Sequence, residues 1–132
     1  MDKVSVLLAS SYTGLSQSLL RLMENEDWIL VVGTSSLALD VVDTTKNMAP
    51  DVVIIDYDLT DKFVEISQVL LNIDPELKIV VLSVLDRVRQ MAIELLLEQK
   101  TSDSPAIKWI SKNSRPAELL KAISASRQRQ LH

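Results

Sequence analysis

Three residues of this sequence have side chains that could share one reaction site: Asp56, Ser83 and Lys112. Each stands at or just after the end of an apolar run that indicates a buried strand, most clearly in the run from Pro50 to Asp56. A carboxylate beside an ammonium and a hydroxyl can attack phosphorus to form an aspartyl phosphate. The ammonium would neutralise developing charge, and the hydroxyl would donate a hydrogen bond to a phosphoryl oxygen. Taken singly, the three residues also have ordinary explanations, as a helix cap, a surface lysine and a buried serine.

Five apolar runs alternate with segments of helical period, and these elements must position the candidate residues. The runs are Val4–Ala9, Trp28–Val32, Val52–Ile55, Lys78–Leu82 and Ala106–Ile110. Repeated strand–helix units predict a parallel sheet with right-handed crossovers. The expected fold class is α/β, a flavodoxin-like (βα)5 doubly wound sheet of strand order 2-1-3-4-5, in a single domain over residues 1–132. Ligands bind such sheets beyond the carboxyl ends of the strands, where the three residues fall.

The segments between the runs carry signals for helix ends. Pro116 suits the first turn of the last helix. Because the sequence has only two glycines, Asn25, Asn47 and Asn72 are expected to take the left-handed conformation where helices end. The stretch from Gln99 to Pro105 has the composition of a loop.

The fourth helical segment has apolar residues on two faces. Its expected core face consists of Val88, Met91, Ala92 and Leu95. At about 100° per residue, Ile93 and Leu97 fall nearly opposite this face and one turn apart. They predict an exposed apolar pair, and with it a homodimer or partner contact through the fourth helix and the fifth strand.

Composition excludes several classes of protein. Hydrophobic residues make up 47% of the chain and charged residues 24%, as in a folded soluble domain, and the net charge of −4 argues against a general nucleic-acid surface. There is no cysteine, and the only histidine is His132, so disulfides, thiolate or imidazole metal sites and a catalytic histidine are not expected. No apolar stretch reaches membrane-spanning length, so the expected location is the cytoplasm.

The order of these motifs resembles that of the receiver domains of two-component response regulators, over nearly the whole chain. The resemblance rests on the run from Pro50 to Asp56, on Val80-Val81-Leu82-Ser83, and on Lys112 followed four residues later by Pro116. It implies a non-enzymatic signalling module in a phosphorelay. Its expected partners are a sensor histidine kinase or other signalling proteins.

The resemblance also implies a role for each matching residue. Asp56 falls on the phosphoacceptor, Ser83 on the switch hydroxyl and Lys112 on the family's lysine. Trp109 falls where receivers carry the aromatic residue that swings with the switch hydroxyl. Asp58 falls where the family offers a backbone carbonyl to the metal ion.

Other positions depart from the receiver pattern. Receivers hold Mg²⁺ with two adjacent acids after the first strand, and Ser10 and Ser11 occupy those positions here. Because Mg²⁺ usually takes one or two carboxylates besides phosphate and water, we expect weak or absent metal binding at Asp56 and Asp58. The stretch from Gln99 to Pro105 resembles an insertion. The sequence thus predicts an atypical receiver, which either accepts a phosphoryl group on Asp56 or signals by protein contacts without phosphorylation.

An alternative interpretation comes from another class of protein. The segment from Ser11 to Ser16 resembles the phosphate loop of flavodoxins, since it is rich in hydroxyls and precedes a helix. It would imply FMN binding, with Tyr12, Tyr57 or Trp109 covering the flavin ring. Serine and threonine are also ordinary helix N-caps, and aromatic residues make up only 4% of the chain.

Overall fold

A single parallel sheet organises residues 3–97 and 106–125, which the computed structural model describes. Its strand order is β2-β1-β3-β4-β5, as predicted. The strands are β1 (Val4–Ala9), β2 (Ile29–Ser35), β3 (Val52–Asp56), β4 (Lys78–Ser83) and β5 (Ile107–Ser111). Predicted and observed strands overlap throughout, and β1 has the predicted bounds. The predicted loop from Gln99 to Pro105 lies outside the described residues.

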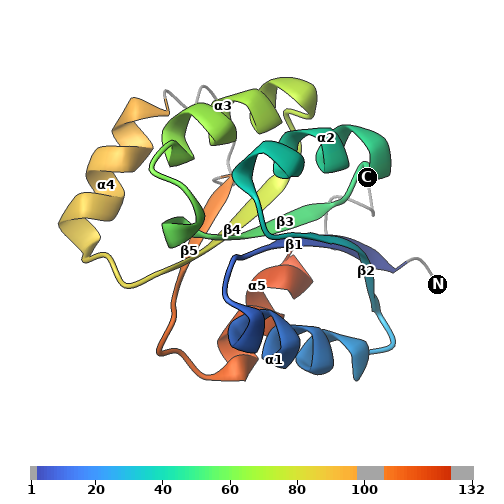
Figure 1. The fold of residues 1–132 in the computed structure, drawn as a ribbon. Helices are drawn as coiled ribbons and strands as arrows, with labels where there is room; N and C mark the ends of the chain where they lie inside the picture. The colour runs from blue at the N-terminus through green and yellow to red at the C-terminus, as the bar shows by residue number, and fades with distance from the viewer. Residues whose placement is uncertain (1–2, 98–105, 126–132) are drawn as a thin grey trace.

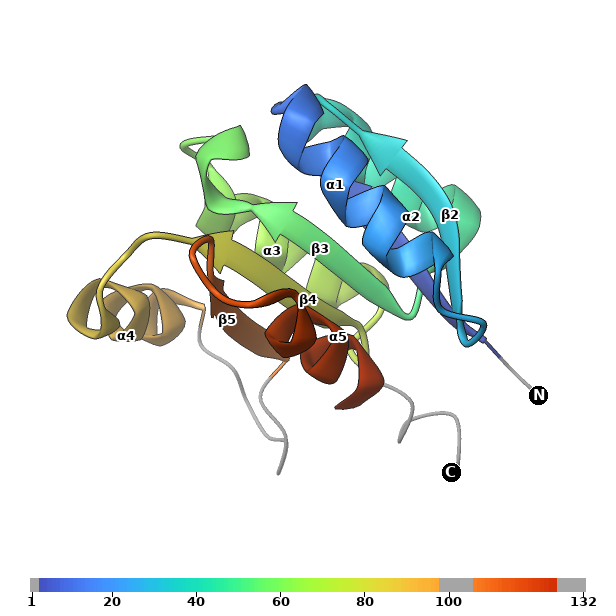
Figure 2. The ribbon, with the colours of Figure 1, turned by 90° about the horizontal axis from the view of Figure 1, so that it is seen from below.

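Helices cover both faces of the sheet. They are α1 (Thr13–Glu24), α2 (Ala38–Met48), α3 (Phe63–Ile73), α4 (Arg87–Leu96) and α5 (Pro116–Ala125), with a short 3₁₀ turn, η1 (Tyr57–Leu59). Helices α1 and α5 lie on one face, and α2, α3 and α4 lie on the other (Figure 1). The view from below shows α1 and α5 in front of the strands (Figure 2). Helix α5 begins at Pro116, as predicted. No helix among the described residues is long and apolar enough to cross a membrane.

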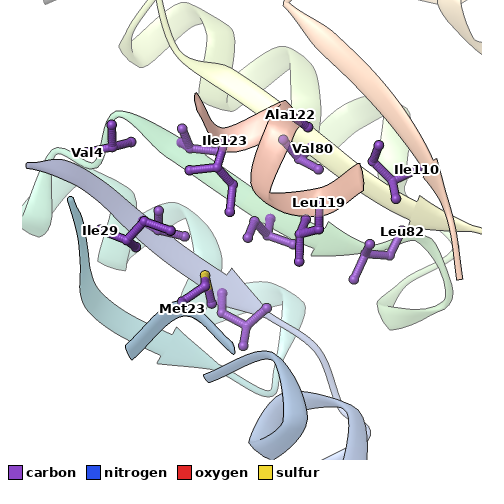
Figure 3. Close-up of a cluster of buried hydrophobic side chains, with 13 residues drawn as sticks. Val4, Met23, Ile29, Val80, Leu82, Ile110, Leu119, Ala122 and Ile123 are labelled. Carbon is purple, nitrogen blue, oxygen red and sulfur yellow. The ribbon is translucent and has the colours of Figure 1, made fainter. Parts of the chain in front are cut away.

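The central strands β1, β3 and β4 are buried on both sides because their alternate residues enter two separate cores. In β1, Val6 and Leu8 join the core under α1 and α5, and Leu7 and Ala9 join the core under α2, α3 and α4. The first core also takes Met23 and residues of α5 such as Ile123, as Figure 3 shows. Two-sided burial explains why the sequence of the central strands is almost continuously apolar.

Helix α4 faces the sheet with the opposite side from the one predicted. Val88, Met91 and Leu95 of the expected core face are 75%, 50% and 80% exposed, whereas Leu97 is only 6% exposed. Ile93 packs against the core under α2 and α3. The prediction that Ile93 and Leu97 form an exposed pair is therefore wrong. Both faces of α4 are apolar, so periodicity alone could not choose between them.

Helix α2 ends at an unexpected residue. Ala49 has φ 45° and ψ 56°, and it is the only non-glycine residue with positive φ in the described part of the chain. Asn25 caps α1 in a right-handed conformation, and Asn72 lies within α3. The predicted left-handed asparagines are therefore wrong. The reversal occurs at Ala49, whose N–H donates to Thr45 O just before the chain enters β3.

Candidate functional site

The candidate residues gather at the carboxyl edge of the sheet. Asp56 is the last residue of β3 and is fully buried between β1 and β4. Strand β4 ends at Ser83, which pairs with Ser111 of β5, and Lys112 follows directly. Ser10 follows β1. Parallel strands bring these four ends to one edge, as the sequence predicted.

Lys112 connects two carboxylates at this edge. Its Nζ lies 2.7 Å from Asp56 Oδ1 and 2.7 Å from Asp58 Oδ2. Its backbone N–H donates to Ser83 O at 3.1 Å, which fixes where the side chain leaves β5. The predicted proximity of Asp56 and Lys112 is confirmed.

The surroundings of Lys112 stabilise its charged form. Burial of the ammonium tends to lower its pKa, but the hydrogen bonds and charges of Asp56 and Asp58 outweigh that effect and raise the pKa above its usual value. The side chain is 18% exposed. The Nζ also lies 5.4 Å from the ring centroid of Tyr12, within reach of a cation–π contact.

Asp56 has two further hydrogen-bond donors. The Asp58 N–H donates to Asp56 Oδ1 at 3.0 Å, which makes Asp56 the cap of η1. The Ser10 hydroxyl donates to Asp56 Oδ2 at a longer 3.4 Å, and Ser10 Oγ itself accepts from Tyr12 N. Both carboxylate oxygens of Asp56 are thus engaged. Ser11, by contrast, is exposed.

The sequence did not predict the side-chain role of Asp58. Only a backbone carbonyl was expected there, whereas its carboxylate holds Lys112. The sequence feature that could have predicted this role is the acid two residues after Asp56, because a tight turn at that spacing brings the two carboxylates close together.

Ser83 and Trp109 lie near the edge with other partners. The Ser83 hydroxyl is buried and accepts from Leu85 N at 2.8 Å. The Trp109 indole N–H donates to Glu94 Oε1 of α4 at 2.7 Å. Its ring lies 6.2 Å from the ring of Tyr57 and 5.9 Å from that of Phe63, centroid to centroid. The sequence analysis did not single out Glu94, which ties α4 to β5.

The donor set at this edge differs from a carboxylate-rich metal site. No group of three or more Asp, Glu, His or Cys side chains within residues 3–97 and 106–125 is arranged to hold a metal ion. Ser10 offers a hydroxyl where a carboxylate would be needed, and an ammonium already lies against both Asp56 and Asp58.

The fold is that of the receiver domains of response regulators. No protein-family model matches the sequence, and no curated protein matches it either. Solved structures do match. The isolated REC domain of RcsB from Salmonella enterica serovar Typhimurium, determined with the phosphomimetic BeF3−, has a TM-score of 0.78 and 20% identity, and the match covers 96% of this chain and 90% of that one.

Two further solved structures show how much of each chain the similarity covers. The signal receiver domain of NarL from Mycobacterium tuberculosis gives a TM-score of 0.78 at 19% identity, over 96% of this chain and 98% of that one. A longer RcsB chain from Salmonella typhimurium gives 0.78 at 20% identity, and the match covers 97% of this chain but 60% of that one. The chain thus spans about three fifths of this longer response regulator.

Proposed function

We propose that this chain is an atypical receiver module that signals by protein contact without phosphorylation of Asp56. One observation carries the proposal: buried Asp56 is satisfied by Lys112 and Asp58 N, while serines stand where a metal-binding pair of acids is needed. A metal ion supplies several kcal/mol of transition-state stabilisation, so its loss would slow phosphoryl transfer on the order of a thousandfold. We place the module in the cytoplasm.

Phosphoryl acceptance from a sensor histidine kinase is the competing form of this function. Asp56 would be the nucleophile and Lys112 would neutralise the transferred group. Ser83 would supply the hydrogen bond, because a hydroxyl that accepts from Leu85 N still has its own proton to donate.

A phosphorylation assay with a small phosphodonor, with and without Mg²⁺, separates the two forms. We expect little phosphorylation of the wild type under either condition. The Ser10→Asp, Ser11→Asp variant should respond to Mg²⁺, and Asp56→Asn is the negative control. Rapid Mg²⁺-dependent labelling of the wild type at Asp56 would contradict the proposal.

The outer face of α4 is the proposed contact surface. It carries Val88, Met91 and Leu95, all exposed, and Val84, which is also exposed, lies just before the helix. This outer face replaces the predicted pair Ile93 and Leu97 and keeps the predicted location on the fourth helix. Burial of these side chains against a second copy or a signalling partner is favourable, at about 25 cal/mol per Å² of apolar surface.

Sedimentation of the wild type beside a Val88→Glu, Leu95→Glu variant tests this surface. Because both side chains are exposed, the variant should fold with wild-type stability and lose self-association or partner binding. Leu39→Glu is the matched control, since Leu39 is an exposed leucine on α2, which lies apart from α4 in Figure 1. If wild type and variant are monomers that bind a partner equally, this surface has no role.

No contact favours the FMN interpretation. Tyr57 and Trp109 pack against Phe63 and Lys112 is held by carboxylates, whereas Tyr12, the third aromatic residue of that interpretation, is 55% exposed. We expect added FMN to keep its fluorescence in the presence of the protein.

A further inference from the structure

The ammonium of Lys112 is contacted by side chains from three segments of the chain. Asp56 approaches from the end of β3, Asp58 from η1 and Tyr12 from the turn before α1, while Ser83 O holds the lysine backbone beside β4. The two carboxylate contacts are equally short, at 2.7 Å. The ammonium is therefore a bridging cation and not a partner of Asp56 alone.

A local turn explains why Asp58 takes part. Asp56 accepts a hydrogen bond from Asp58 N, and this bond closes the first turn of η1. The turn brings the Asp58 carboxylate back to the carboxyl edge of the sheet, 2.7 Å from the Lys112 Nζ. Asp56, Asp58 and Lys112 thus form a closed set of contacts, with two negative charges around one positive charge.

We propose that Lys112 is the resident cation of this edge of the sheet, held by the carboxylates of Asp56 and Asp58 in place of a divalent metal ion. The inference deepens the proposed function, because it gives the physical reason why the module would not depend on metal. A divalent cation at the same oxygens would lie beside a like charge, and the ammonium therefore competes with it. Removal of the ammonium should create a dependence on divalent cations that the wild type lacks.

Thermal unfolding of three proteins with added MgCl₂ tests this competition. NaCl of matched ionic strength is the control for screening. The wild-type Tm should not respond specifically to Mg²⁺. The Lys112→Met variant should gain several degrees, because a cation that binds only the folded state stabilises it. The gain should disappear in Lys112→Met, Asp58→Asn. A wild type that responds as strongly as Lys112→Met, or a folded Lys112→Met that does not respond, would overturn the proposal.

A second measurement does not require Lys112→Met to fold. The ammonium protons of Lys112, observed by ¹⁵N NMR, should exchange slowly in the wild type because two carboxylates hold them. Asp58→Asn should accelerate the exchange severalfold, and Asp61→Asn, a change at an exposed acid nearby, should not. Unchanged exchange in Asp58→Asn, or loss of the slow signal when Mg²⁺ is added to the wild type, would refute the proposal. Neither of the two measurements uses a phosphodonor. Failure of this inference can therefore be distinguished from failure of the proposed function, which the phosphorylation assay tests.

Discussion

Replacement of Lys112 by methionine should destabilise the domain strongly, because it leaves a charge buried without its partner. Asp56 is fully buried, and its pair with Lys112 is 2.7 Å long. Breaking a buried pair costs about 3–5 kcal/mol. Asp58 N and the Ser10 hydroxyl still donate to Asp56, so we expect a loss near the lower end, about 3 kcal/mol. For a domain of this size, that is a fall in Tm of about 10 °C.

A double-mutant cycle with urea unfolding isolates the pair. Asp56→Asn in the Lys112→Met background removes the unpaired charge, so the double variant should recover most of the lost stability. The Asp58 pair provides an internal comparison, since it has the same length but Asp58 is 49% exposed. Asp58→Asn should therefore cost less than about 1 kcal/mol. If Lys112→Met costs no more than Asp58→Asn, burial of Asp56 does not determine the strength of the pair, and the reasoning fails.

Three other predictions test separate features. The folded state raises the pKa of Lys112 above its usual value of 10.5. The contribution of the charged lysine to stability is therefore complete below pH 10.5 and is lost as the pH rises through the raised pKa. The difference in unfolding free energy between wild type and Lys112→Met should narrow accordingly in alkaline unfolding titrations. Ala49→Gly should raise the free energy of unfolding by up to about 1 kcal/mol, because glycine adopts the left-handed conformation without a steric penalty; a loss in urea unfolding would contradict this. Glu94→Ala should cost about 1–2 kcal/mol by removing the acceptor of the Trp109 indole, and Glu94→Gln, which keeps an acceptor, should cost less; equal losses would show that the hydrogen bond is not the cause.

Much of the architecture could be predicted because it depends on local patterns. Strands buried on both faces have continuous apolar sequences, and the polar residue that ends each run marks the carboxyl edge of the sheet. Asp56 and Lys112 were brought together by this reasoning alone, and the strand order followed from the alternation of strands and helices. The roles assigned to Ser83 and Trp109 by resemblance remain predictions.

The errors arose where a tertiary contact decides between local alternatives. Helix α4 is apolar on two sides, and the contacts of Ile93, Leu97 and Glu94 select the side that faces the core. The Asp58 carboxylate reaches Lys112 because of a turn that a strand pattern does not describe. Ala49 takes a conformation that propensity assigns to glycine or asparagine.

Continuous contacts lead from the residue after Asp56 to the inner side of α4. Tyr57 follows Asp56 and packs on Phe63 and Trp109, and Trp109 binds Glu94 on the inner side of α4. Contiguity does not by itself show that a signal passes along these residues. The contacts that hold α4 with its apolar side outward are the Trp109–Glu94 hydrogen bond, the Gln68–Leu96 hydrogen bond to α3, and the packing of Ile93 and Leu97 against the core. The apolar outer face of α4 is therefore already exposed without phosphorylation of Asp56. A module that docks to its partners without phosphorylation needs such a surface.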